Sequence, residues 1–304
     1  MDMDKVLKSY LEHICGAENV QENIALGTKT TFKIGGPARF FVTAASKQCL
    51  VRLVGALEFI GQKYFILGAG ANVLASDEGY NGVVIRLGFR EIVDNQCFIY
   101  ADAGASLAAV RLFAKDNNLS GLEWSAGIPA TVGGAVYMNA GAFGGSISEV
   151  VAMVDILYNG EVITVDSREC GFGYRTSAFQ KGKRFGGAVI VGAYFFLKTE
   201  DKAKIEAREL EVAKTRREKQ PHEPSAGSVF KRPKEDFSVG RAIEELGLKG
   251  FTIGGAAISE KHAGFIVNKG EAMARDVCKL MRLVKRKVFE AYNVRLQPEI
   301  TMLK

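Results

Sequence analysis

The chain has 304 residues, of which 47% are hydrophobic and 24% charged, an ordinary globular composition in a chain longer than a typical single domain. Two or three packed subdomains are therefore expected. No stretch of about 18 uninterrupted apolar residues occurs, and the N-terminal segment carries both charge signs without the apolar centre of a secretory signal. We expect a cytoplasmic protein with no membrane partner.

Basic residues outnumber acidic ones by 40 to 34, which gives a formal net charge of +6. The basic runs, at 181–184, 231–234 and 282–287, are short and lie apart, and they show no RNA-binding aromatic signature and no helix-turn-helix spacing. We therefore expect no nucleic-acid partner. A modest positive excess also suits an enzyme whose ligands carry several phosphates.

Cysteine and histidine are too dispersed for a metal site. No two cysteines are spaced as CxxC, which favours reduced thiols in a reducing compartment. The five cysteines are Cys15, Cys49, Cys97, Cys170 and Cys278. The three histidines are His13, His222 and His262. We predict no structural zinc.

The first block, residues 1–90, combines an amphipathic N-terminal helix with a small α/β unit. Apolar residues at helical spacing, among them Leu50, Leu53 and Leu57, predict a helix over 46–62. A strand, a tight Gly-Gly-Pro turn and a second strand are expected across 30–42. Further strands are expected at 64–67 and 83–87.

The second block, residues 91–200, and the third, residues 201–304, also mix helices and strands. The second is expected to contain strands at 98–103, 151–158, 161–165 and 188–197 and a helix at 107–117. The third is expected to contain helices at 202–218, 239–246 and 271–292 and strands at 253–259 and 295–303. Ile205, Leu210 and Val212 are the apolar residues of the charged helix 202–218, which Pro221 ends.

Two glycine-rich segments could hold a phosphate-bearing ligand. After an apolar strand, the sequence GAGAN at 68–72 can point successive backbone N–H groups at an anion, but it is neither a GxGxxG fingerprint nor a Walker A loop. A tight turn between core strands is an equal alternative. The glycine- and alanine-rich segment 127–145 favours backbone lying flat against a large planar or pyrophosphate-bearing ligand, with dense packing as the alternative.

Three patches carry reactive side chains in apolar or glycine-rich settings. Arg175, flanked by aromatic residues, could make a bidentate contact with a carboxylate. Ser228 follows a glycine at an expected turn but lacks the glycine of a GxSxG elbow, which favours proton donation over nucleophilic attack. Glu299 lies between apolar neighbours on an expected strand, where burial can raise the pKa of a carboxyl group. We interpret His262 as packed or ligand-adjacent and not as a catalytic base.

In this order the segments resemble the UDP-N-acetylenolpyruvoylglucosamine reductase family of peptidoglycan synthesis. The motifs are FKIGGPA, GAGAN with NGVVIRL, GIPATVGGAVYMNAGAFG, YRTSAF, AGSVFKRP and KHAGFIVN, with QPEI closing the series. The resemblance runs from about residue 30 to residue 304. It implies an α+β chain with an FAD-binding fold of the vanillyl-alcohol-oxidase type, in two α/β subdomains (1–90 and 91–200), plus a C-terminal α+β substrate-binding lobe (201–304).

The resemblance also implies a reaction and its residues. NADPH would reduce FAD, and UDP-N-acetyl-3-O-(1-carboxyvinyl)-glucosamine would be reduced to UDP-N-acetylmuramate. Carried over by position, the catalytic residues are Arg175, Ser228 and Glu299, and we expect them to meet at the isoalloxazine ring. The FAD-lining residues are Gly68, Ala69, Gly70, Ala71, Asn72, Gly127, Ile128, Thr131, Gly133, Gly134, Asn139, Gly141 and Ala142. Candidates for the UDP moiety are Arg216, Lys219, Lys231 and Arg232.

Some positions depart from the family pattern. Ala71 stands where Ser is common, Ala130 replaces a frequent Gly, and Arg232 stands where many relatives have Asn. The compact stretch 197–225 resembles a shorter subtype that lacks a tyrosine-bearing substrate loop. No histidine occurs between His13 and His222, so we expect non-covalent FAD, in a monomer. The alternatives are a flavin-dependent sugar or alcohol oxidase of the same fold and a nucleotide-binding regulatory module.

Overall fold

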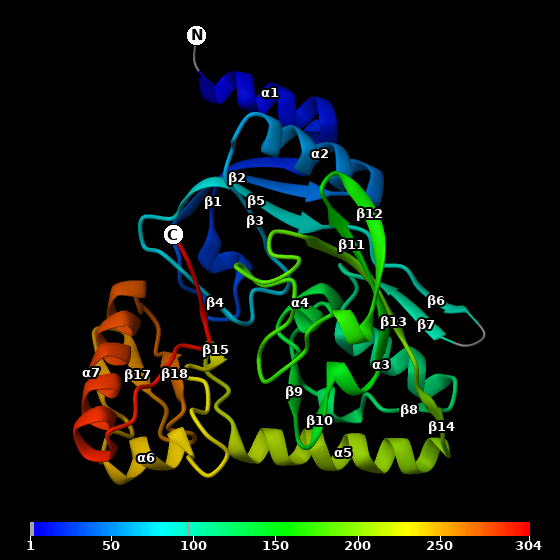
Figure 1. Cartoon of the computed structure of the whole chain (residues 1–304). Helices are drawn as coiled ribbons and strands as arrows, with labels where there is room; N and C mark the ends of the chain where they lie inside the picture. The colour runs from blue at the N-terminus through cyan, green and yellow to red at the C-terminus, as the bar shows by residue number, and fades with distance from the viewer. Residues whose placement is uncertain (1–2, 96–97) are drawn as a thin grey trace. The chain divides into compact units, whose positions relative to one another are not determined.

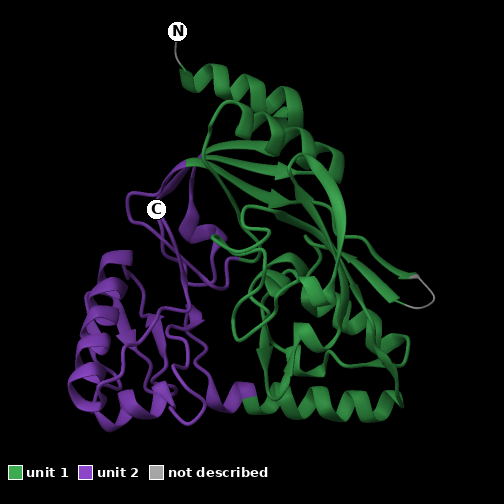
Figure 2. Ribbon diagram, viewed as in Figure 1, with its two compact units in different colours: residues 1–22, 40–69, 82–215 green, residues 23–39, 70–81, 216–304 purple. Residues whose placement is uncertain are grey.

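The computed structural model describes residues 3–95 and 98–304, and Cys97 therefore lies outside the described residues. The chain divides into two compact units, shown in green and purple in Figure 2. Unit 1 comprises 1–22, 40–69 and 82–215, and unit 2 comprises 23–39, 70–81 and 216–304. Each unit is built from segments that are discontinuous in the sequence, and each has its own hydrophobic core.

The helices are labelled in Figure 1, and most of those described lie wholly or mostly in unit 1. They are α1 (Met3–Cys15), α2 (Lys47–Phe59), α3 (Leu107–Asp116), α4 (Val132–Tyr137) and α5 (Lys202–Lys219), whose last turn lies in unit 2. Ser46 and Ser106 cap α2 and α3, because their hydroxyls accept the backbone N–H groups of Cys49 and Ala109. The caps and the apolar spacing explain why both helices begin where the sequence predicts.

The strands that lie wholly or partly in unit 1 form two larger sheets and two small ribbons. One sheet has the order β1 (Val20–Ala25), β2 (Pro37–Ala44), β5 (Tyr80–Leu87), β3 (Tyr64–Ile66), with β3 and β5 parallel. The other is antiparallel in the order β12 (Glu161–Asp166), β11 (Val151–Tyr158), β13 (Val189–Phe195), β7 (Phe98–Asp102), β6 (Ile92–Asn95). The ribbons pair β9 (Gly141–Ala142) with β10 (Gly145–Ser146) and β8 (Leu119–Ser120) with β14 (Lys198–Thr199).

Unit 2 packs helices on a small antiparallel sheet. Its order is β15 (Ser225–Ser228), β18 (Phe265–Asn268), β17 (Ala256–Ile258), β16 (Thr252–Ile253). The helices are α6 (Val239–Glu245) and α7 (Ala274–Tyr292), and β4 (Val73–Ala75) pairs in parallel with β19 (Thr301–Leu303). The Asp77 carboxylate accepts the first two N–H groups of α7, at Ala274 and Arg275, and this negative charge complements the helix dipole.

Three expected elements differ in the structure. Residues 30–36 are an irregular segment and not a strand, because Lys33 has a φ of 55°, which a strand does not allow, although Phe32 and Ile34 are buried. The strand expected at 253–259 is a hairpin of β16 and β17. The strand expected at 295–303 is reduced to β19, so Glu299 lies in a loop.

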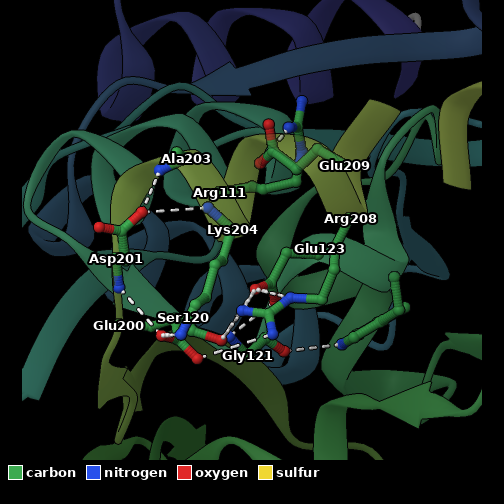
Figure 3. Close-up of polar contacts among 11 residues, drawn as sticks. Arg111, Ser120, Gly121, Glu123, Glu200, Asp201, Ala203, Lys204, Arg208 and Glu209 are labelled. Atoms are coloured by element: carbon green, nitrogen blue, oxygen red, sulfur yellow. Dashed lines mark hydrogen bonds and ion pairs between the residues drawn. The ribbon is translucent and has the colours of Figure 1, made fainter. Parts of the chain in front are cut away.

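Of the three apolar residues expected on the charged helix α5, Ile205 is buried, and the helix otherwise docks through polar contacts. Leu210 is 71% exposed, whereas Glu209 is buried and forms an ion pair with Arg111 of α3. Figure 3 shows a second contact, in which Arg208 points toward Glu123. The Nη2 atom of Arg208 lies 3.0 Å from Oε1 of Glu123. An ion-pair network therefore attaches this helix to unit 1.

Glu123, in the 3₁₀ helix η3 (Glu123–Ser125), is the best-satisfied acid of this network. Its carboxylate accepts the Ser120 hydroxyl and the Gly121 N–H, each at 2.8 Å, besides the Arg208 contact. Burial alone would raise the pKa of Glu123, but these hydrogen bonds and the Arg208 charge outweigh burial, and the net pKa is below its ordinary 4.5.

Replacing Glu123 with alanine is expected to lower the free energy of unfolding by about 3 kcal/mol at pH 7, because Ser120, Gly121 and Arg208 lose a shared acceptor. A group with a lowered folded pKa stabilises the fold above its unfolded pKa, and the stabilisation is lost as pH falls through the folded pKa. The loss should therefore shrink below pH 4.5. Urea denaturation measures it, with Glu211→Ala on the exposed face of α5 as the control. Equal stability of the two variants at pH 7 would contradict the role of Glu123.

The four cysteines in the described part of the chain are free thiols. The Sγ atoms of Cys15 and Cys49 lie 3.2 Å apart, and the Cys15 hydrogen bond lowers the pKa of Cys49 to about 7.

Within the described residues, no helix is both long and apolar enough to cross a membrane, and no group of three or more His, Cys, Asp or Glu side chains could hold a metal ion.

Candidate active site

The loop 68–72 follows β3 and crosses from unit 1 into unit 2 between Ala69 and Gly70. Gly70 has a φ of 68°, and a Cβ there would lie 2.5 Å from the backbone oxygen of Lys29, so the position requires glycine. In the described part of the chain, the backbone N–H groups of Gly68, Ala69, Gly70 and Ala71 have no acceptor. Successive N–H groups without an acceptor in the protein are available to bind an anion.

Asn72 has a different environment from the rest of the loop. Its side-chain amide donates to the carbonyl of Glu299 at 3.1 Å, and its own carbonyl accepts the N–H of Thr301 at 2.8 Å. Both contacts lie within unit 2. Asn72 therefore bonds to the backbone on both sides of Ile300. These two bonds help to fix the position of Glu299.

The segment 127–145 contains the short helix α4, which its glycine-rich sequence did not predict. Thr131 caps α4, since its hydroxyl accepts the N–H of Gly134 at 3.3 Å. A Cβ at Gly133 would lie 3.0 Å from that of Ala103, and one at Gly145 would lie 2.3 Å from the Trp124 ring. Close packing within unit 1 thus accounts for these glycines, as the packing alternative proposed. Ile128 and Ala142 pack against the core of the unit.

Arg175 lies on a tight turn in which Gly173 and Thr176 form an isolated bridge. Its φ of 55° is in the left-handed region, which is unfavourable for a residue with a Cβ. The guanidinium donates to the carbonyl of Gly141 at 2.8 Å and lies 5.2 Å from the centre of the Tyr174 ring. The half-buried guanidinium is therefore held in one direction by the glycine-rich segment and the neighbouring tyrosine.

Ser228 is at the end of β15, on a bulge and not on the expected turn. Ser225 pairs with Val267 and Ser228 with Phe265, so one extra residue lies on the β15 side. Gly227 supplies it with a φ of 75°, which glycine adopts without strain. Such a bulge redirects the next side chain, here the half-buried Ser228.

Glu299 lies beside the strand of Ser228. Its N–H donates to the carbonyl of Val229 at 2.8 Å, and the neighbouring Pro298 forms an isolated antiparallel β-bridge with Phe230. The structure thus brings Ser228 and Glu299 together within unit 2, while Arg175 belongs to unit 1. The side chain of Glu299 is half-buried.

The candidate UDP-binding residues all belong to unit 2. Arg216 is half-buried in the last turns of α5, and burial lowers its pKa. Lys219 and Arg232 are exposed, and Lys231 is half-buried, with its N–H bonded to the Gln297 carbonyl at 2.9 Å.

His262 packs against its neighbours in unit 2. Its Nδ1 accepts the N–H of Gly264, its ring contacts Phe265 edge-on, and burial lowers its pKa.

Sequence reasoning missed one residue of this region. Gln180 directly follows the YRTSAF motif, and its amide nitrogen lies 3.2 Å from the Arg175 carbonyl. A single glutamine after an apolar residue carries no local signal of that contact. Only the fold brings it to the turn.

The free N–H groups of the loop 68–72 suit a pyrophosphate, which is the part of FAD that backbone N–H groups bind most readily. A model of an FAD-binding domain matches residues 38–166. The fold and this domain match define an FAD-dependent oxidoreductase with an α+β architecture and a C-terminal domain, which confirms the expected fold class and cofactor.

A model of the UDP-N-acetylenolpyruvoylglucosamine reductase C-terminal domain matches residues 220–303. The chain is 46% identical to the UDP-N-acetylenolpyruvoylglucosamine reductase of Fervidobacterium nodosum, over 93% of this chain and 91% of the relative. It is 42% identical to that of Thermotoga sp. strain RQ2, over 98% and 97% of the two chains. The chain belongs to the UDP-N-acetylenolpyruvoylglucosamine reductase family.

A solved structure agrees with this assignment. The crystal structure of UDP-N-acetylenolpyruvylglucosamine reductase from Thermus caldophilus superposes with a TM-score of 0.81 at 36% identity, covering 93% of this chain and 98% of that one. The similarity extends over nearly the whole chain, so the family assignment does not depend on one motif.

Proposed function

We propose that this protein reduces the enolpyruvyl ether of UDP-N-acetyl-3-O-(1-carboxyvinyl)-glucosamine to the lactyl ether of UDP-N-acetylmuramate, with NADPH as the hydride donor, in peptidoglycan precursor synthesis. The observation that carries the proposal is the family similarity over nearly the full chain, with both the FAD-binding and the C-terminal models matched. Bound FAD would accept hydride from NADPH and supply it to the vinyl methylene carbon of the substrate.

The residues proposed to hold FAD are those of the two glycine-rich segments. The free N–H groups of Gly68, Ala69, Gly70 and Ala71 would bind the pyrophosphate. Gly127, Ile128, Thr131, Gly133, Gly134, Gly141 and Ala142 complete the proposed lining. Asn72 and Asn139 also belong to the proposed lining. Both side-chain amides bond to protein groups, so we propose that these two residues support the FAD-binding segments.

Arg175 is proposed to bind the substrate carboxylate. Hydride addition at the methylene carbon pushes charge through C2 into that carboxylate, and a preorganised cation there stabilises the developing charge. The left-handed backbone and the bond to Gly141 support this role, because they hold the guanidinium before substrate arrives.

Ser228 is proposed to deliver a proton to C2, and Glu299, if protonated, to stabilise the enolate-like charge. An unassisted serine hydroxyl is a poor acid, so we propose a relay through water or Lys231, three residues along the chain. The bulge at Gly227 and the bond from Glu299 N–H to Val229 support the pairing of Ser228 with Glu299.

The finer assignments are proposals of the same kind. Arg216, Lys219, Lys231 and Arg232 would contact the UDP moiety, in a lobe of the shorter subtype without a tyrosine-bearing loop. The protein would be a cytoplasmic monomer with non-covalent FAD and no nucleic-acid or membrane partner. The three-part division at residues 90 and 200 remains a prediction beside the two compact units.

Two measurements test the function. The purified protein should show the visible spectrum of oxidised flavin, and denaturation should release that flavin. It should consume NADPH beyond the amount that reduces its own flavin only when the enolpyruvyl UDP-sugar is present. Reduced enzyme that reacts with air faster than with the UDP-sugar would favour the oxidase. A colourless protein without flavin would favour the nucleotide-binding module.

A further inference from the structure

The turn that carries Arg175 needs outside support, because the backbone of Arg175 is in the left-handed region. For a residue with a Cβ this conformation is less stable than the right-handed one, so it persists only where neighbouring contacts favour it. Within the turn, Gly173 and Thr176 exchange backbone hydrogen bonds at 3.1 and 3.2 Å. These bonds close the turn but do not attach it to the rest of unit 1.

Gln180 makes one attachment, and it bonds directly to the Arg175 peptide. Its amide nitrogen donates to the carbonyl of Arg175 at 3.2 Å and to the carbonyl of Tyr137, the last residue of α4, at 3.1 Å. Its amide oxygen accepts the Thr176 hydroxyl at 3.3 Å, which sets the direction of the amide. The Gln180 side chain therefore links the Arg175 peptide to the C-terminal end of α4.

Neighbouring contacts fix the same junction from both sides. The Ser177 hydroxyl donates to the Tyr137 carbonyl at 2.7 Å, and the Asn139 amide donates to the Gly173 carbonyl at 3.0 Å. Ser177 is 1% exposed and Asn139 is 7% exposed, so these bonds are shielded from water. Among these contacts, the bond from Gln180 is the one made to the backbone of Arg175 itself.

We infer that Gln180 is a positioning residue for the reaction: it holds the Arg175 peptide in the left-handed conformation that directs the guanidinium toward the substrate carboxylate. The inference rests on the proposed function of Arg175. Gln180 does not touch the reacting atoms in this scheme. Its loss should let the turn relax, so that the guanidinium spends only part of its time in the productive direction.

The test uses Gln180→Met, which keeps the length of the side chain and removes both N–H donors, in the FAD-loaded enzyme. Reduction of the flavin by NADPH should keep its rate within about twofold. Re-oxidation of the reduced enzyme by the UDP-sugar, measured anaerobically by stopped flow, should slow about tenfold, the cost of one to two lost hydrogen bonds. Gln62→Met is the matched control and should leave both steps unchanged, because the side-chain amide of Gln62 is on the surface and donates to the neighbouring Lys63 carbonyl.

A double-mutant cycle separates positioning from general stability. In an Arg175→Ala background, Gln180→Met should slow re-oxidation by less than about twofold, because nothing is left to position. An additive tenfold loss in that background, or equal slowing of both half-reactions in the single variant, would overturn the inference.

If Gln180→Met does not fold with FAD, Thr176→Val serves as the second variant. It removes only the hydroxyl that orients the Gln180 amide, and it should slow re-oxidation about threefold with normal flavin reduction. Unchanged re-oxidation in this variant would overturn the inference. An unmodified enzyme that fails to reduce the UDP-sugar would instead overturn the proposed function, so the two failures are distinguishable.

Discussion

Replacing Ser228 with alanine is expected to leave flavin reduction by NADPH intact and to slow turnover of the UDP-sugar by about 10²–10⁴-fold, the usual contribution of a positioned proton donor. The hydroxyl is placed by the bulge at Gly227, and an alanine preserves that backbone. Stopped-flow absorbance of the flavin separates the two half-reactions.

The matched control is Ser225→Ala, at the other end of the same strand. The backbone carbonyl of Ser225, which accepts the Thr31 hydroxyl at 2.7 Å, is retained in that variant. The control should keep both half-reactions. Near-normal reduction of the UDP-sugar by Ser228→Ala would show that another group delivers the proton.

Replacing Arg175 with alanine is expected to slow the oxidative half-reaction by about 10²–10³-fold, because the carboxylate loses its charge-stabilising partner as negative charge develops. Arg175→Lys should recover little of this loss, since an ammonium lacks the planar pair of donors that binds a carboxylate bidentately. Single-turnover rates of reduced enzyme with the UDP-sugar measure both variants.

Arg168→Ala is the control for Arg175→Ala. The Arg168 side chain is 87% exposed and pairs with Asp166 on the surface, so its loss should not alter either half-reaction. A variant at Arg175 that binds the UDP-sugar and is re-oxidised at the unmodified rate would remove Arg175 from the proposed catalytic set.

Local patterns predicted the helices well where caps and apolar spacing agreed. The predicted and observed starts of α2 and α3 coincide within a residue, because Ser46 and Ser106 are N-caps at the edge of an apolar helical face. The prediction of a strand at 30–34 was wrong for a physical reason. Phe32 and Ile34 alternate as strand residues do, but Lys33 turns the backbone left-handed, and both side chains enter the core of unit 2 from a loop.

The order of the motifs was enough to predict the family, the cofactor class and the candidate side chains. Glycine permits a phosphate loop, and an arginine between aromatic residues suits a carboxylate, so chemistry could be assigned to residue types before any fold was known. The patterns did not reveal α4, since its Val-Gly-Gly-Ala sequence has a low helix propensity that packing overrides.

What the sequence alone determined was therefore the inventory: which residues could bind phosphate, carboxylate or a proton, and in what order along the chain. The tertiary structure decided how each one is held. It assigned Glu209 and not Leu210 to the buried face of α5, placed Ser228 on a bulge beside Glu299, and brought Gln180 to the peptide of Arg175. Hydrogen bonds between residues far apart in the chain depend on the packing of whole elements, and no local pattern of residue types encodes that packing.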